Sequence, residues 1–258
     1  MCRWIAYSGS AITLEHYVTQ PSHSLVVQSL RALESTVGLN GDGFGLGWYG
    51  AGHPEPGTYH EVRPAWSDGN LKSLCRHLSS HLFFAHVRAA TGTPVTRTNC
   101  HPFTFGRWLF MHNGYLANWP RMRRAVETMI PDDIYNARGG TTDSEAMFLV
   151  LLAQGLADER AATDPVEATR KLLARLTEMA GEEPLLFTAA LSDGQDLYAF
   201  RYGVNATANT LYYRASPSGV VVVSEPLDDD RATWIEVPSN AALIARAGQG
   251  VQLAPLLS

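Results

Sequence analysis

The sequence lacks any long hydrophobic run and any block of like charges. Its longest apolar run covers eight residues, from Ala146 to Ala153, whereas a membrane-spanning helix needs roughly 18. The amino-terminal residues contain no apolar stretch followed by a small-residue cleavage site, which a secretion signal requires. We therefore expect a cytoplasmic protein with no membrane partner.

The charges are few and nearly balanced. The chain of 258 residues has 20 Lys and Arg residues against 25 Asp and Glu residues, which gives a formal net charge of −5. Because a nucleic-acid-binding surface is normally basic, we expect no nucleic-acid partner. With 45% hydrophobic residues, the chain has the composition of an ordinary globular protein that can bury a core without a cofactor or a disulfide.

Cysteine is scarce, with Cys2, Cys75 and Cys100 as its three occurrences. An odd number of cysteines in a reducing compartment argues against a disulfide framework, so each is a buried apolar side chain, a metal ligand or a nucleophile. The surroundings of Cys75 and Cys100 match no known local signature of a nucleophile, and burial is the default for both. Cys2 differs because it is the second residue of the chain.

The patterns for cofactors and metals are weak. Residues 45–50 (GLGWYG) fit the GxGxxG pattern, but a dinucleotide site needs a helix directly afterwards, and the proline-containing segment 51–56 follows instead. His77 and His81 have HxxxH spacing without the glutamate that zinc proteases carry between the two histidines. We therefore expect neither a cofactor nor a metal.

Strand-like and helix-like segments separate clearly along the chain. Aromatic and β-branched residues predict early strands at 3–8, 43–49, 82–89 and 107–115. Apolar residues at helical spacing predict helices at 14–19, 24–33, 118–129, 143–156 and 164–180. Short apolar runs between turn signals predict later strands at 186–191, 197–202, 210–215, 220–224, 233–237 and 241–245.

This order of elements indicates the fold class. Strands, then helices, then strands without regular βαβ alternation favour an α+β protein with antiparallel sheets and helices on the outer faces. The alternation of glycine with bulky residues at 43–49 suits a strand that another backbone approaches closely. Since no long linker or internal repeat interrupts the chain, we expect one domain.

Cys2 could act as a nucleophile whose base belongs to the same residue. A small residue at the second position normally allows removal of Met1, which leaves a thiol and a free α-amine on Cys2. An α-amine has a usual pKa of about 7.7–8.0 and a thiol one of about 8.5, so the partly neutral amine can accept the thiol proton. The alternative is that Cys2 simply begins a buried strand.

Asn113 and Gly114 could stabilise the intermediate of acyl transfer to Cys2. A tetrahedral oxyanion needs two hydrogen-bond donors, and this pair offers a side-chain amide next to a backbone N–H without a Cβ. An Asn-Gly pair is also typical of a hairpin turn, which is the structural alternative.

Arg88 and Asp143 could bind a substrate that carries an α-carboxylate and an α-ammonium group. Arg88 lies in an apolar strand, a position typical of bidentate carboxylate binding, although a structural ion pair would also explain it. Asp143 lies at a predicted helix start, where it could serve as the matching anion or only as a helix cap.

Taken together, these residues occur in an order and spacing that resembles the class II glutamine amidotransferases of the N-terminal-nucleophile hydrolase superfamily. The matching segments are Met1-Cys2, GDGFG at 41–45, AHVRAAT at 85–91, NCHPF at 99–103, MHNG at 111–114 and TTDSE at 141–145. The later segment SEPLDDD at 224–230 is similar to the stand-alone members. Two departures are Arg3, where many members have glycine, and residues 39–45, which replace the RGPD-type segment of the synthase-fused members.

The resemblance implies a fold and a catalytic set. The implied fold is a four-layer αββα sandwich of two antiparallel sheets, formed by one domain over residues 2–258 after removal of Met1. Cys2 is implied as the nucleophile with its α-amine as base, and Asn113 and Gly114 as the oxyanion hole.

The resemblance also implies a substrate-binding set. Arg88 would bind the α-carboxylate of glutamine, and Asp143 would bind its α-ammonium group. His86, Thr91 and His101-Pro102 would support these positions.

Three functions fit this resemblance. The first is a glutamine amidohydrolase or amidotransferase that releases ammonia through a γ-glutamyl thioester, with a synthase subunit that accepts ammonia as a further partner. The second is a hydrolase of a larger γ-glutamyl conjugate, like the family members of ergothioneine biosynthesis and glutathione degradation. The third is a non-catalytic glutamine-binding subunit, against which the presence of Cys2 and both oxyanion donors counts.

Overall fold

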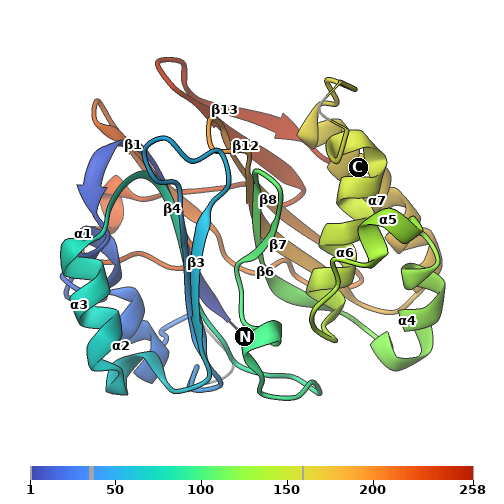
Figure 1. The fold of residues 1–258 in the computed structure, drawn as a ribbon, viewed down its shortest axis with the longest axis horizontal. Helices are drawn as coiled ribbons and strands as arrows, with labels where there is room; N and C mark the ends of the chain where they lie inside the picture. Colours follow the sequence, from blue (N-terminus) through green and yellow to red (C-terminus); the bar gives the residue numbers. More distant parts are fainter. Residues whose placement is uncertain (1, 35–37, 159, 258) are drawn as a thin grey trace.

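Two antiparallel sheets pack face to face, and helices cover both outer faces (Figure 1). This computed structural model describes residues 2–34, 38–158 and 160–257. The first sheet has seven strands in the order β11 (Ile235–Glu236), β9 (Tyr212–Ser216), β10 (Gly219–Val223), β1 (Arg3–Thr13), β4 (Ser79–Val87), β2 (Phe44–Trp48) and β3 (Gly57–Glu61). The second has six, in the order β13 (Gly250–Pro255), β12 (Ala241–Arg246), β8 (Leu197–Val204), β7 (Leu185–Ser192), β6 (Trp108–Leu116) and β5 (Phe103–Phe105).

The helices form two groups, one on each sheet. Figure 1 shows the blue and teal helices beside the first sheet, and these are α1 (Glu15–Val18), α2 (Leu25–Leu30) and α3 (Gly69–His77). The green and yellow helices lie beside the second sheet, and these are α4 (Trp119–Glu127), α5 (Asp132–Tyr135), α6 (Asp143–Leu151) and α7 (Pro165–Ala180). The predicted four-layer αββα sandwich is therefore confirmed.

Successive side chains of a strand point to opposite faces of its sheet, and this alternation creates three apolar cores between the four layers of helices and sheets. In β1, Trp4 and Ala6 point into the core between the two sheets, whereas Ile5 and Tyr7 point into the core under the outer helices. A third core lies between the second sheet and α4–α7. Both faces of the central strands are thus buried, and β1 emerges from this packed centre with Cys2 at its amino end.

The glycines of β2 allow the close approach that their spacing predicts. A Cβ on Gly45 would lie 2.1 Å from the His101 carbonyl oxygen, and one on Gly47 would lie 2.7 Å from Pro102 Cγ. A side chain at either position would therefore collide with the His101-Pro102 segment. The His101-Pro102 segment can therefore lie directly against the first sheet, which places the ring of His101 beside that of His86 on β4.

Several local predictions differ from the structure. The predicted helix at 143–156 is α-helical only to Leu151 and continues as a π-helical turn to Leu156, with Gly155 at a positive φ of 106°. His77 ends α3 whereas His81 lies in β4, so the HxxxH pair does not share a helix. The elements without a predicted counterpart are β3, α3, β5, α5 and β13. In the described parts of the chain, none of the helices could span a membrane by length and apolarity.

Candidate active site

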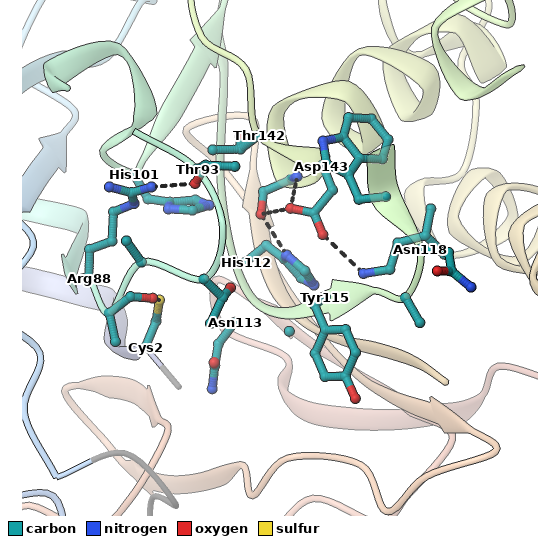
Figure 2. A pocket seen from close by; sticks show the side chains of 18 residues that line it. Cys2, Arg88, Thr93, His101, His112, Asn113, Tyr115, Asn118, Thr142 and Asp143 are labelled. Carbon is teal, nitrogen blue, oxygen red and sulfur yellow. Dashed lines mark hydrogen bonds between the residues drawn. The ribbon is translucent and has the colours of Figure 1, made fainter. Parts of the chain in front are cut away.

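A pocket of about 410 Å³ opens where the amino end of β1 meets the ends of β4 and β6 and the start of α6. Figure 2 shows Cys2 and Arg88 on one side of it, Asp143 on the other, and Asn113 between them. The predicted site residues that line the pocket are Cys2, Arg88, Thr91, Asn113, Gly114 and Asp143. His101, to which the resemblance also gives a supporting role, lines the pocket as well, whereas His86 and Pro102 are outside this lining, and the tilted rings of His86 and His101 have centroids 4.3 Å apart.

Cys2 is half-buried in the pocket, and its Sγ lies 3.7 Å from the Ala89 carbonyl oxygen. Burial raises the pKa of the Cys2 thiol, and the positive charges of Arg88 and Arg3 oppose this shift. Because the thiol is protonated near neutral pH, attack by Cys2 would need a base that removes its proton.

The other two cysteines lie in the core. Burial raises the pKa of Cys75 to about 12 and that of Cys100 to about 11. The Cys100 thiol donates to the carbonyl oxygens of Glu61 and Thr96 rather than pointing into the pocket. Both cysteines thus have the environment of an inert buried thiol.

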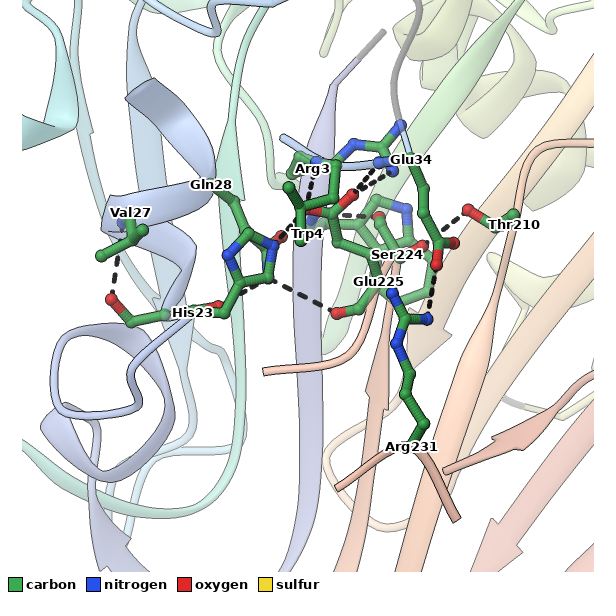
Figure 3. Close-up of polar contacts among 12 residues, drawn as sticks. Arg3, Trp4, His23, Val27, Gln28, Glu34, Thr210, Ser224, Glu225 and Arg231 are labelled. Atoms are coloured by element: carbon green, nitrogen blue, oxygen red, sulfur yellow. Dashed lines mark hydrogen bonds and ion pairs between the residues drawn. The ribbon is translucent and has the colours of Figure 1, made fainter. Parts of the chain in front are cut away.

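The start of β1 is fixed by residues from the far end of the sequence. The Trp4 N–H donates to Ser224 Oγ at 3.0 Å, and the Ser224 N–H donates to the Trp4 carbonyl oxygen at 3.1 Å. Arg3 forms a buried ion pair of 3.6 Å with Glu225 (Figure 3). These contacts hold the two residues that follow Cys2 and come from the first two residues of the SEPLDDD segment.

Glu225 is a buried carboxylate with several donors around it. It accepts hydrogen bonds from His23 Nε2 at 2.6 Å and from the backbone N–H groups of Leu33 and Glu34 (Figure 3). Burial alone would raise the pKa of Glu225, but these hydrogen bonds and the charge of Arg3 bring that pKa below its ordinary value. Glu225 therefore stays ionised and ties three segments together.

Asn113 and Gly114 lie within β6, opposite Thr188 and Phe187 of β7, so the hairpin-turn alternative is wrong. The Asn113 side chain is buried, and neither its Nδ2 nor its Oδ1 has a hydrogen-bond partner in the described residues. An unpaired buried amide is costly unless a ligand completes it. A Cβ on Gly114 would lie 2.0 Å from the Leu186 carbonyl oxygen, so this position requires glycine.

Arg88 is buried with its guanidinium near the pocket. It donates to Thr93 Oγ1 at 2.6 Å and to the Pro94 carbonyl oxygen at 3.3 Å, and within residues 2–34, 38–158 and 160–257 it has no carboxylate partner. The structural ion pair considered for Arg88 is thus not found there. A buried cation without a counter-ion favours binding of an anionic group.

Asp42 positions the segment that carries Arg88. Its Oδ2 accepts a hydrogen bond of 2.8 Å from the Ala90 N–H, and its own N–H donates to the Arg88 carbonyl oxygen. Asp42 has no role predicted from the sequence, although it lies in the GDGFG segment that contributes to the resemblance.

Asp143 faces the pocket from the first turn of α6. Its Oδ2 accepts from the Leu116 N–H at 3.0 Å and its Oδ1 from the Ser144 N–H at 2.8 Å. The cap of α6 is Thr142, whose side chain accepts from the Glu145 N–H, so Asp143 is not the cap that the sequence allowed. No arginine or lysine in the described chain pairs with Asp143, so its charge remains available to a ligand.

Buried histidines form the floor behind the pocket. The His86 and His101 ring centroids are 4.3 Å apart, and His86 Nε2 lies 3.3 Å from the His112 carbonyl oxygen. Burial lowers the pKa of His86 to about 3 and also lowers the pKa values of His101 and His112. These rings are therefore neutral. Among the described residues, no three His, Cys, Asp or Glu side chains form a group that could hold a metal ion.

The family model for class II glutamine amidotransferases matches residues 15–218. The chain is 31% identical over 306 residues to the "Probable glutamine amidotransferase DUG3" of Saccharomyces cerevisiae, covering 100% of this chain and 85% of that protein. It is also 31% identical over 258 residues to "Gamma-glutamyl-hercynylcysteine sulfoxide hydrolase" of Mycobacterium tuberculosis, covering 99% and 97% of the two. A solved structure titled as a glutamine aminotransferase class-II domain protein from Silicibacter pomeroyi superposes with a TM-score of 0.76 at 35% identity, over 100% of both chains.

The similarities to the two relatives and to the solved structure cover 99–100% of the chain, and they agree with the sandwich fold and with the predicted resemblance. The relatives are named as an amidotransferase and a hydrolase, which identifies this protein as an enzyme. The chain belongs to the class II glutamine amidotransferases, within the N-terminal-nucleophile hydrolase superfamily.

Proposed function

We propose that this enzyme hydrolyses a γ-glutamyl amide bond with Cys2 as the nucleophile and releases glutamate. The observation that carries the proposal is the content of one pocket: a thiol, an unpaired amide at Asn113, and two opposite charges, Arg88 and Asp143, neither of which forms an ion pair with another described residue. An α-amino acid head group would satisfy both charges at once. A γ-carbonyl on the same substrate would then reach toward Cys2 and Asn113.

The proposed reaction has two stages. The Cys2 α-amine takes the thiol proton, and Sγ attacks the γ-carbonyl carbon to give a tetrahedral oxyanion held by Asn113 Nδ2 and the Gly114 N–H. The proton passes to the amide nitrogen, the C–N bond breaks, and ammonia or an amine leaves a γ-glutamyl thioester. Water then attacks the thioester as the α-amine takes its proton, and the C–S bond breaks as the ammonium returns that proton to sulfur, which gives glutamate, the free thiol and the free amine.

The amine exists only after Met1 has been removed, and we propose this processing as part of the function. An intact-mass measurement of the purified protein is expected to give the mass of residues 2–258. A homogeneous product that retains Met1 and still hydrolyses its substrate would contradict the role of the amine. We also propose that residues 2–258 act as one domain, since both sheets contribute to the same pocket.

The size of the pocket favours a second candidate, a larger γ-glutamyl conjugate rather than free glutamine. A volume of about 410 Å³ lies in the range of roughly 300–1,000 Å³ that holds drug-sized ligands. Tyr115 and Trp119 also line the pocket, and their aromatic rings offer apolar surface to a leaving group. The names of the relatives include both an amidotransferase and a γ-glutamyl conjugate hydrolase, and so support both candidates.

Glutamate release from glutamine and from γ-glutamyl conjugates tests the proposal. Wild-type protein is expected to release glutamate from at least one of them, and Cys2→Ala is expected to lose this activity. Cys75→Ala is the matched control because it removes a buried thiol away from the pocket. Equal rates for wild type and Cys2→Ala would refute the proposed function, and the ratio of rates between glutamine and the conjugates decides between the two substrates.

A further inference from the structure

Asn209 contacts the candidate oxyanion hole from a distant part of the chain. It lies between β8 and β9, is buried, and donates from Nδ2 to the Asn113 carbonyl oxygen at 3.1 Å, across 96 positions of sequence. Neither the sequence motifs nor the lining of the pocket includes it.

Asn209 is itself held in place by a buried arginine. Arg201 of β8 donates from Nε to the Asn209 carbonyl oxygen at 2.9 Å. The same guanidinium donates from one terminal nitrogen to Glu236 at 2.7 Å and to the Val237 carbonyl oxygen. Because Arg201 is fixed at several points, Asn209 has little freedom to move away from Asn113.

The hydrogen bond from Asn209 is accepted by the peptide group between Asn113 and Gly114. The Asn113 carbonyl and the Gly114 N–H belong to the same planar trans peptide, in which the C=O and N–H bonds point in opposite directions. A donor that fixes the carbonyl oxygen therefore also fixes the direction of the Gly114 N–H. It draws electron density toward that oxygen as well, which makes the N–H a stronger donor, as in any chain of hydrogen bonds.

We propose that Asn209 is a positioning residue for the oxyanion hole: it aligns and polarises the Asn113-Gly114 peptide so that the Gly114 N–H can stabilise the tetrahedral intermediate. This inference rests on the proposed function. It extends that function with a residue that touches neither substrate nor nucleophile. Its effect belongs to the transition state because the oxyanion forms only during reaction, so substrate affinity should change little.

The main test is Asn209→Asp, which keeps the shape of the side chain and replaces its N–H donor by an acceptor. We expect kcat to fall by roughly tenfold to a hundredfold, less than the ~10²–10³-fold loss on removal of an oxyanion donor itself, with KM within about twofold of wild type. Asn209→Ala removes the donor without introducing a charge and should show the same pattern. Asn205→Asp is the matched control, because Asn205 Nδ2 also donates to backbone carbonyls, those of Gly181 and Glu183, outside the pocket.

Alkylation of Cys2 by iodoacetamide separates positioning from a general structural effect. In this reaction Sγ displaces iodide from a CH₂ carbon and forms no oxyanion, so its rate should be the same in wild type and both Asn209 variants. The inference is overturned if kcat is unchanged in both variants, if the loss lies in KM, or if kcat, alkylation rate and thermal stability fall together. An active Cys2→Ala protein would instead refute the proposed function, which distinguishes the two failures.

Discussion

Replacing Arg88 by alanine would leave the α-carboxylate of a bound substrate without its partner in a buried site. Arg88 is 3% exposed, so a charge pair between its guanidinium and the substrate would be largely desolvated. Truncating one partner of a buried, hydrogen-bonded charge pair costs about 2–5 kcal/mol. At about 1.4 kcal/mol per tenfold change, substrate affinity should fall roughly 30- to 4,000-fold.

Binding can be measured without turnover by calorimetric titration of a Cys2→Ala protein. The dissociation constant for the preferred γ-glutamyl substrate is compared between this protein and the Cys2→Ala/Arg88→Ala double variant. Arg97→Ala in the same background is the control, because Arg97 is exposed and pairs with Glu61 away from the pocket. We expect its affinity to match that of Cys2→Ala alone.

The result that refutes this reasoning is an affinity within twofold of the parent in the Arg88→Ala double variant. Unfolding of the ligand-free proteins provides a second check on the same point. If Arg88 served a structural buried ion pair, its removal would cost the free protein roughly 3–5 kcal/mol. Because Arg88 has no carboxylate partner in the described chain, we expect a smaller loss of stability and a large loss of binding.

Two further predictions concern stability. The pKa of Glu225 is lowered in the folded protein, so its carboxylate contributes stability above its unfolded pKa of about 4.3 and loses that contribution as the pH falls through the lower, folded pKa. In urea unfolding between pH 7 and pH 3, the free energy of unfolding should therefore fall less with decreasing pH for Glu225→Gln than for wild type. Identical pH dependences of the two proteins would contradict this role of Glu225. Gly114→Ala should lower the free energy of unfolding by about 1–3 kcal/mol or more, because its Cβ would lie 2.0 Å from a carbonyl oxygen. Gly69→Ala, where a Cβ meets nothing within 4 Å, is the control, and equal stabilities of the two variants would show that the backbone at Gly114 relaxes.

The layers of the fold were predictable because they follow from the order of strongly apolar elements. The elements that escaped prediction are weakly apolar or short. β13 is an edge strand with mostly exposed side chains, and β3 is a half-buried edge strand, so neither shows the alternation that marks a strand with one buried face. Thr142 could have been predicted as the N-cap of α6 from the sequence, since Thr142 and Glu145 have capping-box spacing.

The candidate site likewise contains some residues that sequence patterns reveal and others that they do not. Cys2, Arg88, Asn113 and Asp143 could be selected because their chemistry is unusual for their local sequence, and the structure brings them to one pocket. Asp42 and Asn209 are ordinary polar residues in loops, and their partners are backbone groups 48 and 96 positions away. Only the tertiary structure determines those pairings, so sequence patterns cannot reveal them.

The contacts of Arg3 and Trp4 with residues 224–225 have a consequence for the order in which the chain can fold during synthesis. The strand that carries Cys2 leaves the ribosome first, yet the contacts of Trp4 with Ser224 span 220 positions of the chain. Until β10 and Glu225 have been made, β1 lacks its neighbour on one side and Arg3 lacks its counter-ion. The contacts that fix the start of β1 beside the candidate nucleophile can therefore form only after residues 224–225 have been synthesised.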